Sequence, residues 1–135
     1  MKLFATLFVA LAGFLPCFGQ DVFYDLAAVQ PPAEFDNIHV EKLGTDKNST
    51  TFVIWVKEEV KPHYHENHTE TLYVLEGNGI MVIGDESKRI GAGNMFIIPK
   101  GTVHSVEVTS DTPLKVLSVQ APEFLGKDRH FTEGE

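Results

Sequence analysis

Three histidines and one glutamate have the composition of an open metal site. His63 and His65 are separated by one residue, Glu70 follows five residues later, and His104 stands alone after the turn at 99–101. Neutral imidazole nitrogens with one carboxylate oxygen suit divalent iron, manganese, nickel, cobalt or zinc, whereas thiolates are typical of a closed structural zinc site. We therefore predict that these four side chains bind one divalent transition metal and leave coordination positions free for chemistry.

The spacing of the histidines indicates a strand. Side chains two residues apart lie on one face of a β-strand, so His63 and His65 are predicted to project together. A metal-binding helix would separate its histidines by four residues. Glu70 has the opposite parity, which requires a turn or bulge through residues 66–69. The later reversal of the chain is expected to bring His104 in beside Glu70 from the adjacent strand.

The rest of the chain consists of short apolar segments separated by turns rich in glycine and proline. At 135 residues its length suits about one domain. Between residue 20 and Gln120 no segment shows a convincing helical period, and β-branched and aromatic residues are frequent. The sequence therefore predicts an all-β sandwich or barrel. The expected strands are 38–43, 51–60, 71–75, 80–83, 89–90, 95–98, 103–108 and 114–119, and the side chains expected to line the interior are Leu72, Val74, Phe96, Ile98 and Val106.

The first nineteen residues resemble a secretory signal peptide. Lys2 precedes an uninterrupted apolar run over residues 3–15, and small residues at Cys17 and Gly19 follow. The run is shorter than the roughly 18–20 residues that span a bilayer. A lipoprotein signal is disfavoured because Pro16 precedes the cysteine. We predict cleavage near Gly19, a secreted or periplasmic chain without a membrane segment, and a single domain over 20–135.

Cleavage would also change the composition of the chain. It removes the only cysteine, which excludes disulfides, thiolate ligands and a cysteine nucleophile. It also removes Lys2, so the net charge changes from −8 to −9. An acidic chain lacks the clustered lysines and arginines that phosphate binding needs, and we therefore expect no nucleic-acid partner.

The two motifs together resemble those of the cupin superfamily. They read His63-x-His65-x4-Glu70-x6-Gly77 and Gly93-x5-Pro99-x-Gly101-x2-His104, within a core of about 51–119. The resemblance implies a double-stranded β-helix, also called a jelly-roll barrel, with the four side chains as metal ligands. The chain departs from the family pattern twice: it has Val108 where many members carry asparagine, and Lys57 where many carry glycine.

The resemblance implies a small-molecule metalloenzyme and leaves the reaction open. Quercetinase-like dioxygenases use such a site with Fe or Ni, and there the metal glutamate, here Glu70, can serve as a base. A Lewis-acid isomerase or decarboxylase with Mn or Zn is an alternative, as is a non-catalytic metal-dependent module that binds a small molecule. Only Lys61 and Lys100 flank the motifs, which favours a small neutral or anionic organic substrate over a phosphorylated one.

The remaining polar and aromatic side chains are expected to have minor roles. His68 is predicted to face solvent on the turn between the ligands, and Gln120 and Tyr64 are weak candidates for contacts around the site. Exposed Trp55 and Tyr73 suggest that a homodimer covers them. Outside the motifs, His39 and His130 are expected to be ordinary surface or partly buried residues, and the glycosylation sequons at Asn48 and Asn67 are expected to be coincidental in a bacterial envelope protein.

Overall fold

The computed structural model describes residues 22–132, so the predicted signal peptide at 1–19 lies outside the described residues. Every regular element between 22 and 132 is a strand. None of the described segments forms a helix long and apolar enough to cross a membrane. The strands are β1 (Ile38–Asp46), β2 (Ser49–Val56), β3 (Glu59–Tyr64), β4 (Thr69–Glu76), β5 (Asn78–Ile83), β6 (Glu86–Gly91), β7 (Met95–Ile98), β8 (His104–Val108), β9 (Leu114–Ala121) and β10 (His130–Phe131).

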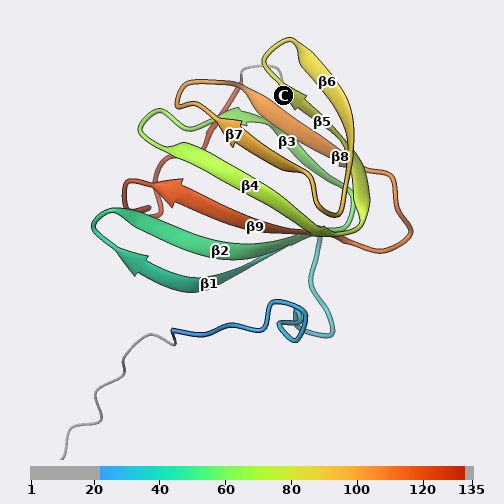
Figure 1. Ribbon diagram of the computed structural model, residues 1–135. Coiled ribbons are helices and arrows are strands. Elements are labelled where there is room, and N and C mark those ends of the chain that lie inside the picture. Colours follow the sequence, from blue (N-terminus) through green and yellow to red (C-terminus); the bar gives the residue numbers. More distant parts are fainter. Residues whose placement is uncertain (1–21, 133–135) are drawn as a thin grey trace, which may run out of the picture.

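The strands form two five-stranded antiparallel sheets that face each other (Figure 1). The first sheet has the order β1-β2-β9-β4-β7, and the second has the order β10-β3-β8-β5-β6. Consecutive strands mostly lie in opposite sheets: only β1 and β2, and β5 and β6, are sequence neighbours that stay in the same sheet. This is an all-β jelly roll, as the sequence predicts.

One predicted strand is wrong in its extent. The segment 51–60 was expected to be continuous, but it divides into β2 and β3, which belong to opposite sheets. Asn37 accounts for the break, because it captures the backbone amides between the two strands. Its carbonyl accepts from the amide of Lys57 at 2.8 Å, and its side-chain oxygen accepts from the amide of Glu58 at 2.9 Å. The short strand β10 was not predicted.

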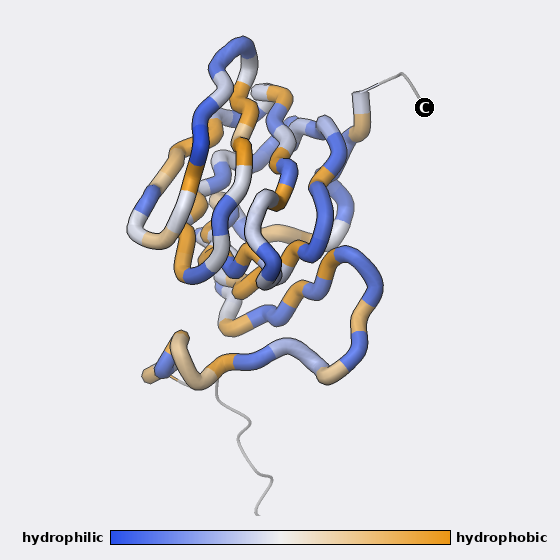
Figure 2. Tube along the Cα trace, turned by 90° about the vertical axis from the view of Figure 1, so that its right-hand side faces the viewer, coloured by the Kyte–Doolittle hydropathy of each residue, from blue (hydrophilic) through white to orange (hydrophobic). Residues whose placement is uncertain are grey.

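The hydrophobic core lies between the two sheets. Apolar and polar residues alternate along most strands (Figure 2), as expected where one face of each strand is buried. The side chains predicted to line the interior all belong to the core or pack against it. They are Leu72, Val74, Phe96, Ile98 and Val106.

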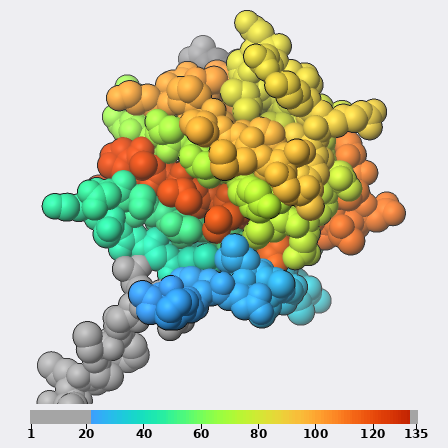
Figure 3. All heavy atoms as spheres, in the orientation of Figure 1, coloured from blue at the N-terminus to red at the C-terminus, as the bar shows by residue number. Residues whose placement is uncertain are grey.

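The segment that precedes β1 packs against one end of the first sheet, at the bottom of the view in Figure 3 (blue). Lys115 of β9 is 1% exposed, and its ammonium group donates to the carbonyls of Leu26 at 2.7 Å and Val29 at 2.9 Å. The same group lies 5.6 Å from the ring centroid of Trp55, which is 3% exposed. The expectation that Trp55 needs a partner chain to cover it is wrong, because this chain covers it. Tyr73 is 40% exposed, and the homodimer stays a prediction.

Replacing Lys115 with methionine is expected to lower the free energy of unfolding by about 1–3 kcal/mol. Methionine keeps the aliphatic contact with Trp55 but leaves the carbonyls of Leu26 and Val29 without their donor. Urea unfolding followed by tryptophan fluorescence measures the loss. Lys88→Met is the matched control, because Lys88 pairs only with exposed Glu86 and its loss should change stability little. Equal unfolding midpoints for the two variants would contradict this account.

Candidate metal centre

The two sheets bring the predicted ligands together from opposite sides of the barrel. His63 of β3 pairs directly with His104 of β8 in the second sheet, and His65 follows the end of β3. Glu70 comes from β4 in the first sheet. The expectation that His104 enters from a strand adjacent to Glu70 is therefore wrong. The neighbours of β4 are β7 and β9, and His104 faces Glu70 across the interior.

The turns predicted from the two motifs carry the chain between the sheets. Residues 65–68 separate β3 from β4, as the parity of the ligands requires, and residues 99–103 separate β7 from β8. Gly101 has a φ of +77°, a conformation that costs a side-chain-bearing residue strain. Its amide donates to the carbonyl of His65 at 2.6 Å. This bond ties the second motif to the first beside the histidine ligands.

Backbone carbonyls fix the orientation of all three imidazoles. The Nδ1 atom of His63 lies 2.8 Å from the carbonyl of Lys61, and that of His104 lies 3.0 Å from the carbonyl of Thr102. The Nδ1 atom of His65 lies 2.6 Å from the carbonyl of Asp128. A carbonyl only accepts, so each Nδ1 carries the proton, and in the neutral ring Nε2 holds a free lone pair. This is the arrangement in which histidine binds a metal.

The free nitrogens converge on a carboxylate. Oε2 of Glu70 lies 3.3 Å from Nε2 of His104 and 3.5 Å from Nε2 of His65, while Oε1 accepts from Ser118 at 2.6 Å and Gln120 at 3.1 Å. The Nε2 atoms of His65 and His104 are buried and have no hydrogen-bond partner among the described residues. Buried acceptors facing one another are unfavourable unless a cation lies between them. The donor set therefore fits a metal ion.

The three histidines form the tighter part of this group. Nitrogen atoms of His63, His65 and His104 lie within 4.8 Å of one another, close enough to hold one ion. Glu70 contacts two of these rings and is not part of that close group. The fourth-ligand role predicted for Glu70 accordingly stays a prediction, as does its role as a base.

Burial and neighbouring groups shift the pKa values of the candidate ligands in different directions. Burial and the neighbouring His104 lower the pKa of His63 to about 4, so this ring is neutral at neutral pH. Burial lowers the pKa of His65, but the adjacent Glu70 outweighs it and the net shift is upward. Burial raises the pKa of Glu70, yet the close imidazoles of His104 and His65 and the hydrogen bonds from Ser118 and Gln120 hold it well below its ordinary value. Glu70 is therefore a carboxylate, which suits it to face a cation.

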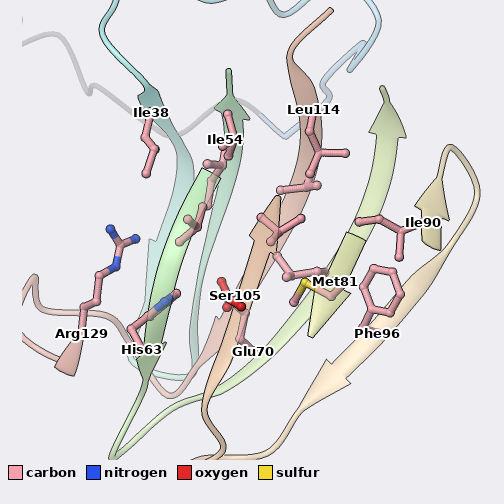
Figure 4. Close-up of a pocket in the computed structure, with 15 residues that line it drawn as sticks. Ile38, Ile54, His63, Glu70, Met81, Ile90, Phe96, Ser105, Leu114 and Arg129 are labelled. Atoms are coloured by element: carbon pink, nitrogen blue, oxygen red, sulfur yellow. The ribbon is translucent and has the colours of Figure 1, made fainter. Parts of the chain in front are cut away.

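A narrow apolar cavity lies beside these side chains (Figure 4). Its volume is about 50 Å³, which leaves room for only a few water molecules. His63 and Glu70 line it together with aliphatic and aromatic side chains, among them Ile54, Leu72, Met81, Phe96, Val106 and Val116. Arg129 also lines the cavity, although neither motif points to it. An apolar surrounding strengthens electrostatic interactions at the ligand atoms.

Asp128 anchors the loop that carries His65, and sequence reasoning missed it. Its carboxylate accepts from the amides of Glu66 at 3.1 Å and Asn67 at 2.9 Å and also bonds to Nδ1 of His68. Burial raises the pKa of Asp128, but these bonds, that of His68 first, hold it well below its ordinary value. The prediction that His68 faces solvent is wrong: it is 6% exposed and wedged between Asp128 and the carbonyl of Glu123.

Of the two other side chains predicted to contact the site, Gln120 does so and Tyr64 has a different partner. Gln120 does contact Glu70, as its position suggested, and so does Ser118, which lies two residues earlier on the same face of β9. Tyr64 instead stacks on His130, at a centroid distance of 5.1 Å. His130 also forms a second acidic group with Glu66 and Asp128. The Asp128 oxygens there already accept from backbone amides, which makes this group a poorer cation site than the histidines.

Asp128→Asn is expected to weaken metal binding by about 10–100-fold, the usual effect of disturbing a partner of a ligand. The amide nitrogen would face donors from the 66–68 loop, and the loop holding His65 would loosen. A competition titration with a fluorescent zinc chelator measures the affinity. Asp85→Asn, in an exposed turn, is the matched control and should leave the affinity unchanged. An unaltered affinity in the Asp128 variant would show that the loop needs no such anchor.

The fold and the site together define a class of protein: a small jelly-roll barrel with imidazole and carboxylate groups gathered at an internal apolar cavity. Residues 50–120 match the Cupin_2 family, described as Cupin domain. The match spans more than half of the chain, and the chain belongs to this family.

Relatives of the chain include proteins with and without a described activity. An uncharacterized protein of Aquifex aeolicus is 36% identical over 93 residues, which are 69% of this chain and 76% of that protein. L-ectoine synthase of Aliivibrio fischeri is 30% identical over 95 residues, or 70% of this chain and 72% of that enzyme. Quercetin 2,3-dioxygenase of Bacillus subtilis is 38% identical over 53 residues, but these are only 39% of this chain and 16% of that enzyme.

The solved structures agree with the fold. An uncharacterized protein from Klebsiella pneumoniae with a double-stranded beta-helix domain superposes with a TM-score of 0.68 at 21% identity. The superposition covers 84% of this chain and 97% of that one. At this level of identity the likeness concerns the fold alone.

Proposed function

We propose that the chain is a metal-dependent cupin enzyme that oxidises a small organic molecule with dioxygen. The observation that carries the proposal is the set of buried Nε2 atoms that face Glu70 without a hydrogen-bond partner among residues 22–132. His63, His65 and His104 would hold one divalent iron, manganese, nickel or zinc ion, with Glu70 as the fourth ligand. Such an ion, when redox-active, supplies a place for substrate and dioxygen to meet.

The chain's own residues provide the remaining functions. Ser118 and Gln120 occupy Oε1 of Glu70, which leaves Oε2 to bind the ion or, when it is released from the ion, to accept a proton from substrate. The neighbouring rings of His104 and His65 hold the pKa of Glu70 down, so moving them away from Oε2 would raise its basicity. The apolar side chains around the cavity exclude bulk water from this oxygen.

A Lewis-acid reaction without dioxygen is the second candidate. It is favoured by one comparison: the match to L-ectoine synthase spans 72% of that enzyme, whereas the match to quercetin 2,3-dioxygenase spans 16%. The small cavity, about 50 Å³, also favours a substrate of few atoms over a flavonol. A non-catalytic module that binds a small molecule would use the same ligands without turnover.

Oxygen uptake separates these functions. Protein loaded with Fe(II), Ni(II) or Mn(II) would be tested against small diketones, catechols and flavonols in an oxygen electrode, with product analysis by mass spectrometry. Oxygen uptake coupled to loss of substrate supports oxidation of the substrate by dioxygen. Product formed without oxygen uptake supports a Lewis-acid reaction. Binding of a test compound without turnover supports a non-catalytic binding module.

Export of the protein belongs to this proposal as well. It is supported by the apolar run at residues 3–15 behind Lys2. Expression of the full chain in a bacterial host, followed by fractionation and determination of the N-terminal sequence, tests it. A mature chain that begins near Gln20 outside the cytoplasm is expected, whereas an uncut chain in the cytoplasm would contradict it.

A further inference from the structure

Arg129 brings a fixed positive charge to the cavity beside the metal ligands. It lines the cavity together with His63, and in Figure 4 its guanidinium group lies on the same side as His63 and reaches toward Ile38. The chain has only two arginines, and the other, Arg89, is an exposed residue of β6. Arg129 is the only lysine or arginine among the described residues that line the cavity.

The backbone on both sides of Arg129 is anchored. Before it, the Asp128 carboxylate accepts from the amides of Glu66 and Asn67. After it, His130 and Phe131 pair with Tyr64 and His63 of β3. The arginine is therefore held at the cavity by two attachments to the segment that carries the histidines, and its position does not depend on a free chain end.

The guanidinium group has no partner among the described residues. Although acidic residues outnumber basic ones by 19 to 11, the Arg129 side chain makes no hydrogen bond or ion pair with any residue described between 22 and 132. Asp128 precedes Arg129 in the sequence, but its carboxylate already forms hydrogen bonds with the 66–68 loop. The Arg129 charge instead acts on His63 and His65, where it opposes protonation. Arg129 is exposed, so its donors are solvated by water and available to an anionic ligand.

The net charge of the metal-loaded site would also favour an anionic ligand. Three neutral imidazoles and one carboxylate would leave one net positive charge on a divalent ion, and Arg129 adds a second. The candidate ligands are buried, so the charge of an ion there would be poorly screened, whereas Arg129 is exposed at the edge of the cavity. A guanidinium group offers two parallel donors that match a carboxylate.

We infer that Arg129 selects the substrate by pairing with a carboxylate group, so that the substrate class is a small 2-oxo or 2-hydroxy acid rather than a neutral diketone. The inference rests on the proposed function and deepens it. The carboxylate would lie at the mouth of the cavity against Arg129, with the neighbouring oxygen directed toward the histidines and Glu70. The cavity volume of about 50 Å³ limits the rest of the molecule to a few atoms.

Two probes that differ only in the relevant group test the inference. Pyruvate and butane-2,3-dione have nearly the same size and both carry adjacent oxygens, but only pyruvate has a carboxylate. Zinc-loaded full-length protein, which has no redox chemistry, would be titrated with each by calorimetry. Arg129→Gln is expected to weaken pyruvate binding by about 10–100-fold, as for a charge-assisted hydrogen bond, and to leave butane-2,3-dione binding unchanged. Arg129→Lys should restore part of the loss.

The controls separate this inference from the proposed function. Arg89→Gln makes the same change of charge far from the cavity lining and should leave both affinities unchanged. Zinc content is measured on every variant first, and Arg129→Gln should retain zinc like the wild type. Equal pyruvate affinity in wild type and Arg129→Gln, an equal loss in both arginine variants, or a zinc-loaded wild type that binds neither probe would overturn the inference alone. A wild type that retains no zinc would overturn the metal site on which it rests.

Discussion

Replacing His104 with alanine is expected to abolish retention of the metal. His104 supplies one of three nitrogens that lie within 4.8 Å of one another, and its Nε2 is buried with no hydrogen-bond partner in the described part of the chain. Removing it deletes a ligand outright, so the loss of affinity should exceed the about 10–100-fold effect that follows when only a ligand's partner is disturbed. Metal content after dialysis, together with a chelator competition titration, measures the loss.

His130→Ala is the matched control for this experiment. His130 belongs to the second acidic group, with Glu66 and Asp128, and does not line the cavity. The His130→Ala variant should therefore retain one metal per chain at nearly wild-type affinity. The reverse result, metal kept by His104→Ala and lost by His130→Ala, would place the ion in the second group and contradict the account.

The Glu70→Gln variant is expected to retain metal with reduced affinity and to lose turnover. Glutamine keeps the shape of the side chain, and its carbonyl oxygen can still accept from Ser118 and Gln120. The atom replacing Oε2 is then an amide nitrogen, which neither accepts a proton nor donates a lone pair to an ion. Metal content and the rate of substrate loss, measured on the same preparation, separate the two effects.

Glu86→Gln is the control for charge, since Glu86 is exposed in β6 and pairs only with Lys88. It should match the wild type in both measurements. Turnover by Glu70→Gln at the wild-type rate would remove Glu70 from the role of base. Complete loss of metal from that variant would instead make Glu70 indispensable as a ligand and leave its role as a base to be tested by other means.

The sequence predicts the part of the site that depends on local pattern. The alternation of apolar residues in β4, β7 and β8 places Leu72, Phe96 and Val106 inward, and the parity break before Glu70 requires the turn that the structure shows. Both are consequences of the two-residue period of a strand, which needs no knowledge of distant contacts.

What the sequence did not reveal depends on contacts between distant segments. Asp128 and Arg129 lie about sixty residues beyond the histidines they serve and beyond the last predicted strand, so no spacing rule connects them. His68 looked like a loop residue because only the fold brings Asp128 against it. The sequence places Lys115 in a strand but does not predict its burial, which follows from the segment that precedes β1.

A crystal structure of the metal-loaded protein, with the ion located by its anomalous scattering, tests the central claim most directly. We expect one ion bound to the Nε2 atoms of His63, His65 and His104 and to Oε2 of Glu70, because backbone carbonyls occupy each Nδ1 and Ser118 and Gln120 occupy Oε1. An ion bound instead by Glu66, Asp128 and His130, or a loaded crystal with no anomalous peak among the three histidines, would contradict it.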